Sequence, residues 1–317
     1  MSRNMRNFIW KSLFPASRNL GFSCLGWTSN PLRPYLPLMT DISFIKMHGL
    51  GNDFVVIDDR DGAIALGIKE SRAIANRRSG VGFDQLLILE KPTTDAADVF
   101  MRIRNPDGSE AQACGNGTRC VASLVMNELA RDQIVIATVV GLLASSRHSD
   151  GRVTVDMGQP GLTWRDVPTS RNVDTLHMGI SADGVIDPVG VNMGNPHAVF
   201  FVDDIAAIAL ERIGPLLEYD DLFPELANIE IVQITGPDQV RMRVWERAVG
   251  ITEACGSGAC AVAVAAHRRG LTGRNVDVTL DGGTLQIEWR EDGHVLMTGP
   301  VATSFEGTFD PTLLAHL

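Results

Sequence analysis

The amino-acid sequence predicts an α+β protein made of two homologous, pseudo-symmetric domains, each a curved mixed β-sheet wrapped around one central helix. Three observations support this prediction. The chain repeats itself, because matching segments recur in the same order at a nearly constant spacing. Each copy carries short runs with alternating apolar residues, the pattern of half-buried strands. Each copy also holds a glycine turn followed by one strongly helical stretch.

The repeat is clearest around two cysteines. Residues 101–103 and 113–117 (Met-Arg-Ile, then Ala-Cys-Gly-Asn-Gly) recur at 242–244 and 254–258 (Met-Arg-Val, then Ala-Cys-Gly-Ser-Gly), an ungapped offset of 141. Other matched pairs, at offsets of 141 to 145, are Gly51-Asn52 with Gly194-Asn195, Asp58-Asp59 with Asp203-Asp204, Gly141-Leu142-Leu143 with Gly283-Thr284-Leu285, and Asp150-Gly151 with Asp292-Gly293. Several matches in one order across more than a hundred residues indicate two homologous halves.

The elements are predicted in the same order in both copies. A strand-like run starts at Ile42, and alternation predicts further strands at 99–104, 153–157, 239–245 and 284–289. The two helical stretches are Thr118 to Arg131 and Ala259 to Arg269. The first breaks near Asp132 and the second ends at Gly270, because glycine is a common stop signal.

Composition excludes several classes of protein. The 317 residues are 44% hydrophobic and 21% charged, which is typical of a globular protein rather than a disordered or collagen-like one. The net charge is −10, and without the five basic residues of the first forty it is 23 minus 38, or −15. We therefore expect no nucleic acid partner. No apolar run approaches the ~18 residues of a membrane span, so we expect no membrane association.

The first 38 residues stand apart from the rest. They are rich in Arg and Ser and contain no acidic residue, which is the composition of an organelle transit peptide. Met39 is followed directly by the first strand-like run. We interpret residues 1–38 as an extension, either disordered or outside the true start of the protein, and exclude them from the fold.

Two of the five cysteines occupy positions with chemical consequences. In both copies a strand leads into Ala-Cys-Gly-x-Gly and then the helix, so that Cys114 and Cys255 lie at or just before a helix N-terminus. The helix dipole there favours a thiolate, and the free N–H groups favour a bound anion such as a carboxylate. The alternative for any single cysteine is that it packs as a buried hydrophobe. That alternative is the better interpretation of Cys120 and Cys260, which lie within the helices, whereas the duplication favours a function for the other pair.

A thiol on each side of one substrate suits inversion at a carbon acid. One group removes a proton from one face and the other delivers a proton to the opposite face. The N–H groups at both helix ends would stabilise the charge that develops beside the carboxylate. No lysine stands in a pyridoxal-binding context, so the thiols are expected to act without a cofactor, and no cysteine spacing indicates a metal site.

Seven motifs in order resemble diaminopimelate epimerases over about Met39 to Pro300. They are Lys46-Met47-His48-Gly49-Leu50-Gly51-Asn52-Asp53-Phe54, Gly82-Phe83-Asp84-Gln85, Asn105-Pro106-Asp107-Gly108-Ser109-Glu110-Ala111, Cys114-Gly115-Asn116-Gly117-Thr118-Arg119-Cys120, Gly194-Asn195-Pro196-His197, Trp245-Glu246-Arg247 and Ala254-Cys255-Gly256-Ser257-Gly258-Ala259-Cys260. The resemblance implies a cofactor-independent isomerase that interconverts LL- and meso-2,6-diaminopimelate in lysine and peptidoglycan precursor synthesis. It also implies a cytoplasmic homodimer, or a plastid protein if the extension is a real transit peptide.

The resemblance also implies roles for individual residues. Cys114 and Cys255 are the acid and base, and His197 and Glu246 tune the thiols. Backbone N–H groups of Gly115, Asn116, Gly256 and Ser257 hold the reacting carboxylate. The rest of the substrate is bound by Asn52, Gln85, Asn105, Asn195, Asn228, Glu246 and Arg247. A guanidinium suits the distal carboxylate, because it offers a fixed fork of donors.

The chain departs from the family pattern at a few positions. Asn228 lacks the Arg-Thr that usually precedes it, and Ala248-Val249 replaces a glycine-rich step. In the family the C-terminal tail returns to the first domain. We therefore expect the first domain to comprise residues 39–160 and 303–317, and the second to comprise residues 161–302.

Two other functions stay open at this point. A proline or hydroxyproline racemase of the same fold would also use two cysteines, but a compact cyclic amino acid would require a small apolar pocket. A non-catalytic thiol or metal-binding protein that senses oxidation is the other alternative. If the two thiols face each other across an empty site, a Cys114–Cys255 disulfide would inactivate the enzyme reversibly.

Overall fold

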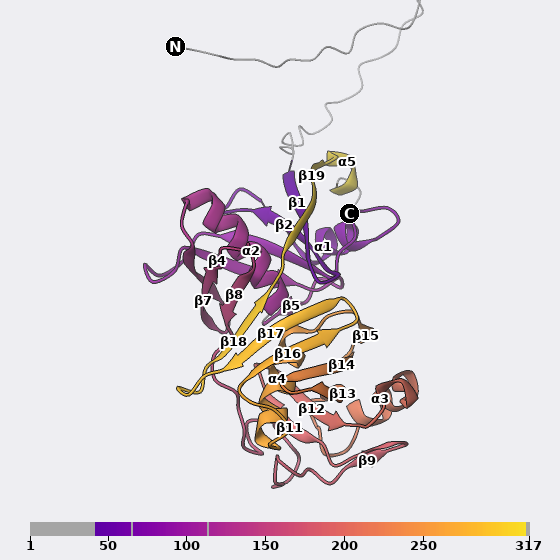
Figure 1. Cartoon of the computed structure of the whole chain (residues 1–317). Coiled ribbons are helices and arrows are strands. Elements are labelled where there is room, and N and C mark those ends of the chain that lie inside the picture. The colour runs from indigo at the N-terminus through magenta and orange to yellow at the C-terminus, as the bar shows by residue number, and fades with distance from the viewer. Residues whose placement is uncertain (1–41, 65, 113, 315–317) are drawn as a thin grey trace, which may run out of the picture. The chain divides into compact units, whose positions relative to one another are not determined.

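A computed structural model describes residues 42–64, 66–112 and 114–314. These residues belong to one compact unit that runs from Thr40 to Leu317. The predicted extension at residues 1–38 and the start at Met39 lie outside the described residues. Figure 1 shows the two halves of this unit, with the first coloured indigo to magenta and the second pink to orange.

The first half contains eight strands in order and two helices. They are β1 (Ile42–Gly49), β2 (Asn52–Asp58), α1 (Ile68–Ala75), β3 (Gln85–Glu90), β4 (Val99–Arg104), β5 (Glu110–Ala111), α2 (Gly115–Leu129), β6 (Gln133–Thr138), β7 (Gly141–Arg147) and β8 (Val153–Asp156). The pairs β2–β3 and β4–β6 are parallel, whereas β1–β2, β3–β4, β4–β5, β6–β7 and β7–β8 are antiparallel. The half is therefore a mixed sheet.

The second half repeats this arrangement. Its elements are β11 (Val189–Asn192), β12 (Pro196–Phe201), a 3-10 turn (Ile205–Ala207), α3 (Leu210–Glu218), β13 (Asn228–Gly236), β14 (Gln239–Glu246), β15 (Gly250–Thr252), α4 (Gly256–Arg268), β16 (Asn275–Leu280), β17 (Gly283–Trp289) and β18 (Val295–Gly299). The parallel pairs are β12–β13 and β14–β16, at the places where the first half has its own. A small β9–β10 hairpin (Ser181–Ala182, Val185–Ile186) precedes β11.

The two halves are joined through equivalent strands. β8 and β18, which end the strand series of each half, pair antiparallel from Val153↔Gly299 to Asp156↔Leu296. Equivalent strands that pair antiparallel are related by a local two-fold axis. The described residues thus form one 17-stranded sheet with a separate hairpin, and the predicted class of two homologous mixed-sheet α+β halves is confirmed.

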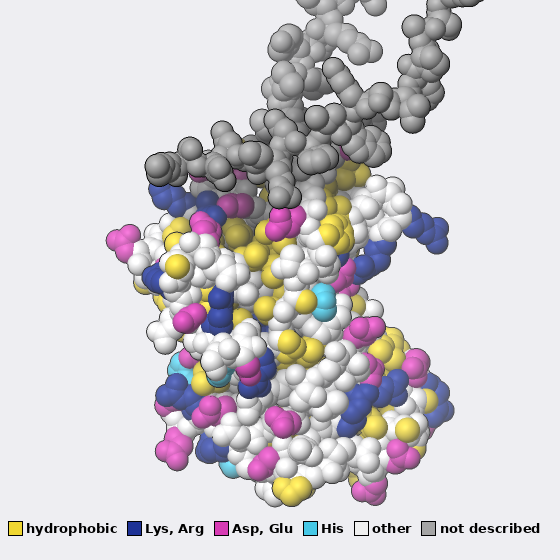
Figure 2. Space-filling model, turned by 45° about the horizontal axis from the view of Figure 1, so that its top comes forward, with side chains coloured by type: hydrophobic (Ala, Val, Ile, Leu, Met, Phe, Trp, Pro, Cys, Tyr) yellow, Lys and Arg dark blue, Asp and Glu magenta, His cyan; other side chains and the backbone are white. Residues whose placement is uncertain are grey.

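The chain returns to the first half at its end. β19 (Ala302–Phe309) pairs antiparallel with β1, and the short helix α5 (Pro311–Leu314) follows it. Figure 1 shows this yellow strand running back beside β1. Around the described surface, acidic and basic side chains are interspersed on the face that Figure 2 shows, with hydrophobic side chains gathered mainly in its upper half.

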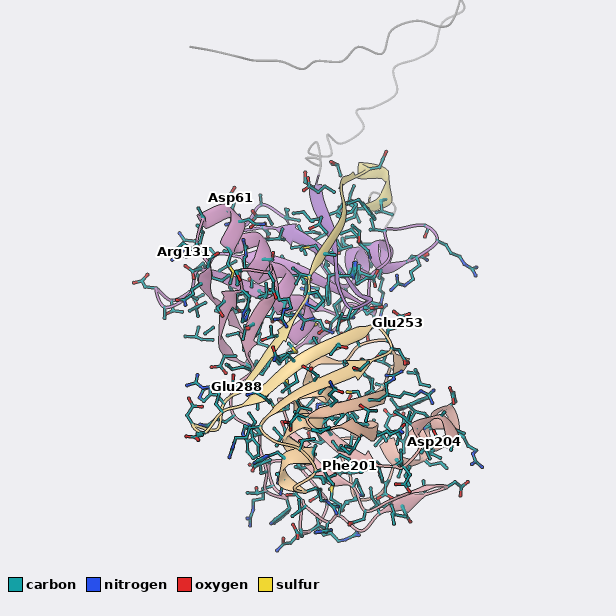
Figure 3. All side chains as sticks on the ribbon, viewed as in Figure 1. Asp61, Arg131, Phe201, Asp204, Glu253 and Glu288 are labelled. Atoms are coloured by element: carbon teal, nitrogen blue, oxygen red, sulfur yellow. The ribbon has the colours of Figure 1, made fainter. Side chains whose placement is uncertain are left out.

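The turn between β1 and β2 extends from the first half into the second. Gly51 has a φ of +85°, and a Cβ built on it would lie 2.2 Å from Glu253 Oε2 of the second half. Leu50 of the same turn packs against the hydrophobic core of the second half. Figure 3 shows Glu253 where the second half faces the first. Only glycine allows both this conformation and this close approach.

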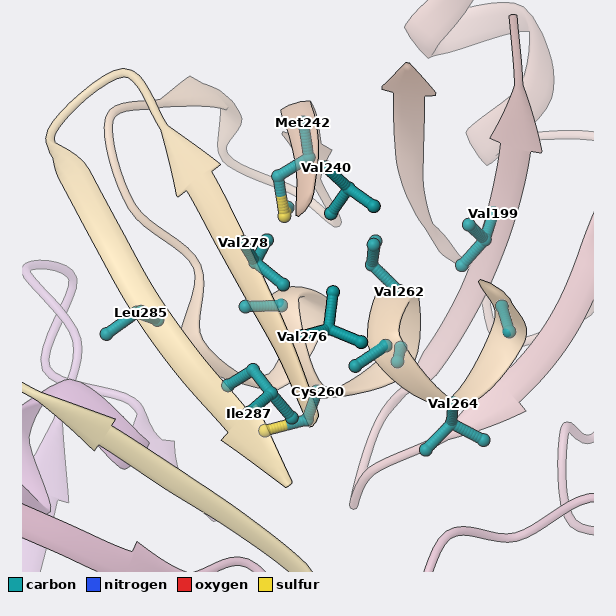
Figure 4. Close-up of a cluster of buried hydrophobic side chains, with 14 of the residues drawn as sticks. Val199, Val240, Met242, Cys260, Val262, Val264, Val276, Val278, Leu285 and Ile287 are labelled. Atoms are coloured by element: carbon teal, nitrogen blue, oxygen red, sulfur yellow. The ribbon is translucent and has the colours of Figure 1, made fainter. Parts of the chain in front are cut away.

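Each sheet wraps around its own helix, as predicted. α2 contacts β1, β6, β7 and β8, and α4 contacts β11, β12, β16, β17 and β18. In the second half Val262 and Val264 of α4 pack among buried side chains of the surrounding strands, including Val278 and Ile287 (Figure 4). Helix α2 has an equivalent core with Val121 and Val125. The helix and sheet of each half therefore stabilise each other by burying a shared apolar core.

We predict that Leu285→Ala lowers the free energy of unfolding by about 2 to 5 kcal/mol, because truncating a fully buried side chain of β17 leaves a cavity. Leu142, which lies in the equivalent strand β7, is 51% exposed, and its change to Ala is expected to cost less than about 0.5 kcal/mol. Urea unfolding of both variants measures the difference. Equal losses would contradict the placement of these strands.

Candidate functional site

Both central helices begin with a cysteine cap. Cys114 and Cys255 are the N-cap residues of α2 and α4, in extended backbone conformations. Their sulfur atoms accept hydrogen bonds from the N–H of Gly117 at 3.3 Å and of Gly258 at 3.4 Å. The helices therefore start at residues 115 and 256, three residues earlier than predicted from the sequence, because the thiol replaces the usual oxygen of a capping side chain. The first-turn amides have no acceptor within the helix.

The two cysteine turns lie next to each other across the halves. The side-chain amide of Asn116 donates to the carbonyl of Ala254, which precedes Cys255, at 3.4 Å, and to Asn52 Oδ1 at 3.2 Å. A Cβ built on Gly115 would lie 2.6 Å from Met297 Cε, and one built on Gly256 would lie 2.9 Å from Met297 Sδ. One methionine thus separates the starts of the two helices, and both cysteines are free thiols.

Burial opposes ionisation of both thiols. It raises the pKa of the Cys114 thiol to about 12, against the lowering effect of the Gly117 N–H and the Arg119 charge. Burial, with Glu246 and Glu230 nearby, raises the pKa of Cys255 well above its usual range. The lowered pKa that we expected from the helix N-termini is therefore wrong for this state of the protein, because the loss of water around the sulfur outweighs the pull of the helix dipole.

Acidic and imidazole groups gather beside Cys255. Burial raises the pKa of Glu246, whose carboxylate accepts hydrogen bonds from Thr252 and Cys255. His197 is fully buried, and its Nδ1 shares a 2.6 Å hydrogen bond with Glu230 Oε1. Its Nε2 lies 2.9 Å from Asn195 Oδ1. The structure thus holds the two predicted thiol-tuning residues on the Cys255 side.

Glu230 is a site residue that the sequence reasoning missed. It has no exposed surface, and its Oε2 has no hydrogen-bond partner among the described residues. A Cβ built on Gly258 would lie 2.9 Å from Glu230 Oε1 and 3.3 Å from Cys255 Sγ, so carboxylate and sulfur are neighbours. A carboxylate inside the apolar run Ile229 to Val232 was the signal available in the sequence.

Asn52 is held beside Cys114 by a network of charges. Its Oδ1 lies 4.0 Å from Cys114 Sγ, and its Nδ2 donates to Asp84 at 2.9 Å. Asp53 next to it pairs with buried Lys46 and with Arg77, which also pairs with Asp84. Although burial raises the pKa of Asp53, the hydrogen bonds from Arg77 and Lys46 lower it to about 2.

In each half, two further predicted ligands lie next to each other at the ends of neighbouring strands. Gln85 starts β3 and Asn105 follows β4, and their amide groups are 3.4 Å apart. In the second half, Asn228 starts β13 and Arg247 follows β14. Since β4 runs antiparallel to β3, and β14 to β13, the start of one strand meets the end of the next.

Asn228 and Arg247 differ in how much hydrogen-bonding capacity they have left. Asn228 is buried; its side chain donates to the Pro196 carbonyl and accepts from the Arg247 N–H, both at 2.9 Å. These two bonds use one donor and one acceptor position of its amide and hold the backbone of Arg247, and the predicted contact of Asn228 with substrate stays a prediction. The Arg247 guanidinium donates to the Glu225 carbonyl at 3.1 Å and is in no ion pair within residues 42–64, 66–112 and 114–314. A carboxylate ligand would therefore find an unpaired cation there.

The described part of the chain contains neither a candidate metal site nor a candidate membrane-spanning helix. No three His, Cys, Asp or Glu side chains of these residues are grouped so as to hold a metal ion. None of the described helices combines the length and the apolar character that crossing a bilayer requires.

Solved structures share this fold at low sequence identity. A phenazine biosynthesis protein of the PhzF family from Bacillus anthracis superposes with a TM-score of 0.63 at 16% identity, over 86% of this chain and all of that one. A hydroxyproline epimerase from Agrobacterium vitis superposes with a TM-score of 0.61 at 14% sequence identity, over 87% of this chain and 95% of that one. These likenesses define the class of fold, a duplicated mixed sheet with one central helix in each half.

The particular family follows from sequence. The family model for diaminopimelate epimerase matches residues 44–163 and 189–304, one segment in each half. The diaminopimelate epimerase of Rhodospirillum centenum is 57% identical over 271 residues, which cover 86% of this chain and 93% of the relative. The diaminopimelate epimerase of Acidiphilium cryptum is 51% identical over 272 residues, which cover 86% of this chain and 98% of the relative. The chain belongs to the diaminopimelate epimerase family, as the sequence motifs indicated.

We predict that Asp53→Asn lowers the free energy of unfolding by about 2 kcal/mol at pH 7, from the fall in pKa between 3.8 and about 2. Because the folded pKa is the lower one, this contribution is present above pH 4 and is lost as pH falls through about 2. Urea unfolding of wild type and variant between pH 7 and pH 3 measures it. The exposed turn residue Asp61 supplies the control variant Asp61→Asn. A stability difference that does not shrink on acidification would show that Asp53 acts by packing alone.

Proposed function

We propose that this chain interconverts LL-2,6-diaminopimelate and meso-2,6-diaminopimelate, with Cys114 and Cys255 as the acid–base pair. The observation that carries the proposal is the meeting of two cysteine-capped helix starts, one from each half, within contact of the same Met297 side chain. A substrate between them presents opposite faces of its α-carbon to the two thiols. The membership of the chain in the epimerase family supports this substrate.

The reacting carboxylate binds at the first-turn amides. N–H groups of Gly115, Asn116, Gly256 and Ser257 have no acceptor within their helices and lie at the positive ends of the helix dipoles. As the α-proton leaves, negative charge moves from carbon onto the carboxylate oxygens. Amides already oriented towards those oxygens stabilise the charge without further rearrangement.

The proton transfers balance between the two sulfur atoms. One thiolate takes the α-proton and becomes a thiol, and the electron pair of the C–H bond moves into the carboxylate. The opposite thiol then protonates the other face of the carbon and becomes the thiolate. Configuration is inverted, and the enzyme carries its negative charge on the other cysteine until protons exchange with solvent.

The raised thiol pKa values assign a role to the substrate's ammonium group. Both sulfur atoms are mainly protonated at neutral pH in the free protein, because burial disfavours the thiolate. An α-ammonium bound beside them would supply the missing positive charge, and Glu246, which accepts a hydrogen bond from Cys255, would accept one from the ammonium. Formation of the base is thereby coupled to binding of the correct ligand.

The distal end of the substrate is recognised by polar side chains of both halves. Arg247 takes the far carboxylate, and the amides of Asn52, Gln85, Asn105 and Asn195 bind the remaining polar groups. A long substrate with two ammonium and two carboxylate groups satisfies these donors and acceptors. A cyclic amino acid has no second carboxylate to pair with the Arg247 guanidinium, which is in no ion pair among the described residues.

We also propose a cytoplasmic homodimer that forms through β19. This strand pairs with β1 and with no other described strand, so one of its edges is free to pair with a second copy. Its Phe305 is 50% exposed. Next to β19 a cavity of about 620 Å³ is lined by apolar side chains such as Phe44, Leu89 and Leu124 and by the charged residues Asp58, Arg60, Glu128 and Glu306. A free strand edge and a half-exposed aromatic residue beside a hollow of mixed polarity suit a self-complementary interface.

Proton NMR in deuterium oxide tests the reaction. We expect LL-diaminopimelate with reduced enzyme to lose its α-proton signal and yield the meso isomer, with proline unchanged in a parallel sample. Exchange of proline alone would indicate that the chain is a proline racemase instead. Exchange of neither substrate would favour the thiol-sensor interpretation.

Variants of the two cysteines test the mechanism in the same assay. Cys114→Ser and Cys255→Ser are each expected to lower epimerisation by about 10²-fold or more, since a hydroxyl is a far weaker acid–base group here. Isothermal titration should still detect substrate binding. Cys120→Ser serves as the matched control in α2, because Cys120 packs in the hydrophobic core and is not one of the two helix-capping thiols. Turnover near wild type in either cap variant would remove that cysteine from the mechanism.

Sedimentation velocity tests the dimer. Wild type should sediment as a species of about twice 34.3 kDa, and Phe305→Asp should shift it to the monomer by placing a charge in the interface. Ile186, which is 72% exposed in the second half, provides the control Ile186→Asp. A monomeric wild-type protein would refute this interface.

A further inference from the structure

Arg119 is a buried cation without an acidic partner. It has no exposed surface, and no ion pair of the described residues includes it. Its Nη1 donates to Asn116 Oδ1 at 3.0 Å and touches Met297 Sδ at 3.4 Å, whereas Nε and Nη2 have no hydrogen-bond partner in the described part of the chain. Burying a guanidinium in this way costs stability, so stability alone does not explain it.

The space around this guanidinium is formed by two glycines. A Cβ built on Gly49, at the end of β1, would lie 2.9 Å from Nη2. One built on Gly299, at the end of β18, would lie 3.1 Å from Cζ and Nε. Any larger residue at either position would displace the guanidinium, which lies where α2 approaches the strand that joins the halves.

Arg119 fixes the orientation of Asn116. The Asn116 Nδ2 donates to the Ala254 carbonyl, which can only accept, so Oδ1 must face away from it. Arg119 supplies the donor that Oδ1 needs on that side. Without the guanidinium, Oδ1 loses its donor, and the amide that links the two cysteine turns is held only by the bonds that Nδ2 donates to Ala254 and Asn52.

Only one of the two homologous halves carries a buried guanidinium at this position. At the offset of 141 residues, Arg119 corresponds to Cys260. Arg119 lies on α2, five residues after the N-cap Cys114, and its charge interacts with Cys114 and the buried Cys120 and Cys260; Cys255 caps the other helix and is not among these groups. Cys255 instead faces the carboxylates of Glu246 and Glu230, the second of which is hydrogen-bonded to His197. Glu246 also acts on Cys114, so the difference between the two sides comes from Arg119, Glu230 and His197.

We infer that Arg119 is a positioning residue of the reaction: it holds Asn116 in the orientation that links the two cysteine turns, and its charge makes Cys114 the first of the two thiols to ionise. The inference rests on the proposed function, in which the two thiols exchange one negative charge. Once the substrate is bound, Cys114 is then the first of the two thiols to serve as the base, and Cys255 is the acid.

Alkylation by iodoacetamide without substrate tests this. Because burial raises the pKa of Cys114 to about 12, the rate for each cysteine is followed from pH 7 to pH 12, and fragment-ion mass spectrometry assigns the label. In wild type, labelling of Cys114 should rise at lower pH than labelling of Cys255, a comparison of midpoints that does not depend on access. In Arg119→Met, the labelling rate of Cys114 at pH 8 should fall roughly tenfold or more relative to wild type. The labelling rate of Cys255 should stay within about twofold of its wild-type value. Arg119→Lys, which keeps the charge, should restore most of the Cys114 rate.

Arg268→Met is the matched control, because Arg268 lies on α4 and donates to Gly190 and Thr175 away from the cysteines. Unfolding is measured for each variant. A folded Arg119→Met with an unchanged Cys114 profile would overturn the inference, as would a wild-type midpoint for Cys255 below that of Cys114. If Arg119→Met does not fold, the wild-type midpoints and the Arg119→Lys profile decide. Because no substrate is present, these results are independent of whether diaminopimelate is epimerised.

Discussion

The site depends on the antiparallel pairing of β8 with β18. These strands are equivalent in the two halves, so their pairing creates the local two-fold axis. Because of this axis, the two central helices start close to each other, and the side chain of Asn116 in one half donates a hydrogen bond to the Ala254 carbonyl of the other. A duplicated domain without this pairing would have two cysteine caps and no shared substrate site between them.

Symmetry of the backbone is accompanied by asymmetry of charge. Equivalent positions hold Arg119 in one half and Cys260 in the other, while Glu230 and His197 lie on the Cys255 side. The proposed reaction removes a proton from one face of the α-carbon and delivers another proton to the opposite face, which requires two sulfur atoms with similar surroundings but different proton affinity at any moment. The backbone provides the similar placement, and a few buried charges, strengthened by the low polarity around them, provide the difference.

Much of the architecture could be predicted from the sequence, because it depends on local patterns. Alternating residues located β4 at 99–104 as observed, and the repeat correctly predicted two related halves. The helix starts were placed three residues late, since the rule for capping side chains does not anticipate a thiol cap. The family motifs named residues that the structure gathers at strand ends. No role could be predicted for Glu230 or Arg119, because each is the single charged residue in an apolar or small-residue run. Only their neighbours in three dimensions indicate what they do.

The sequence by itself determined the family, the duplication and the two cysteine turns, since these are written in residue types at fixed spacing. The tertiary structure alone decided the ionisation of the thiols and the roles of single polar side chains. Burial reversed the expected fall in the pKa of Cys114, and backbone hydrogen bonds occupy the amide of Asn228. The physical reason is that desolvation and charge pairing depend on which residues, distant in sequence, exclude water together.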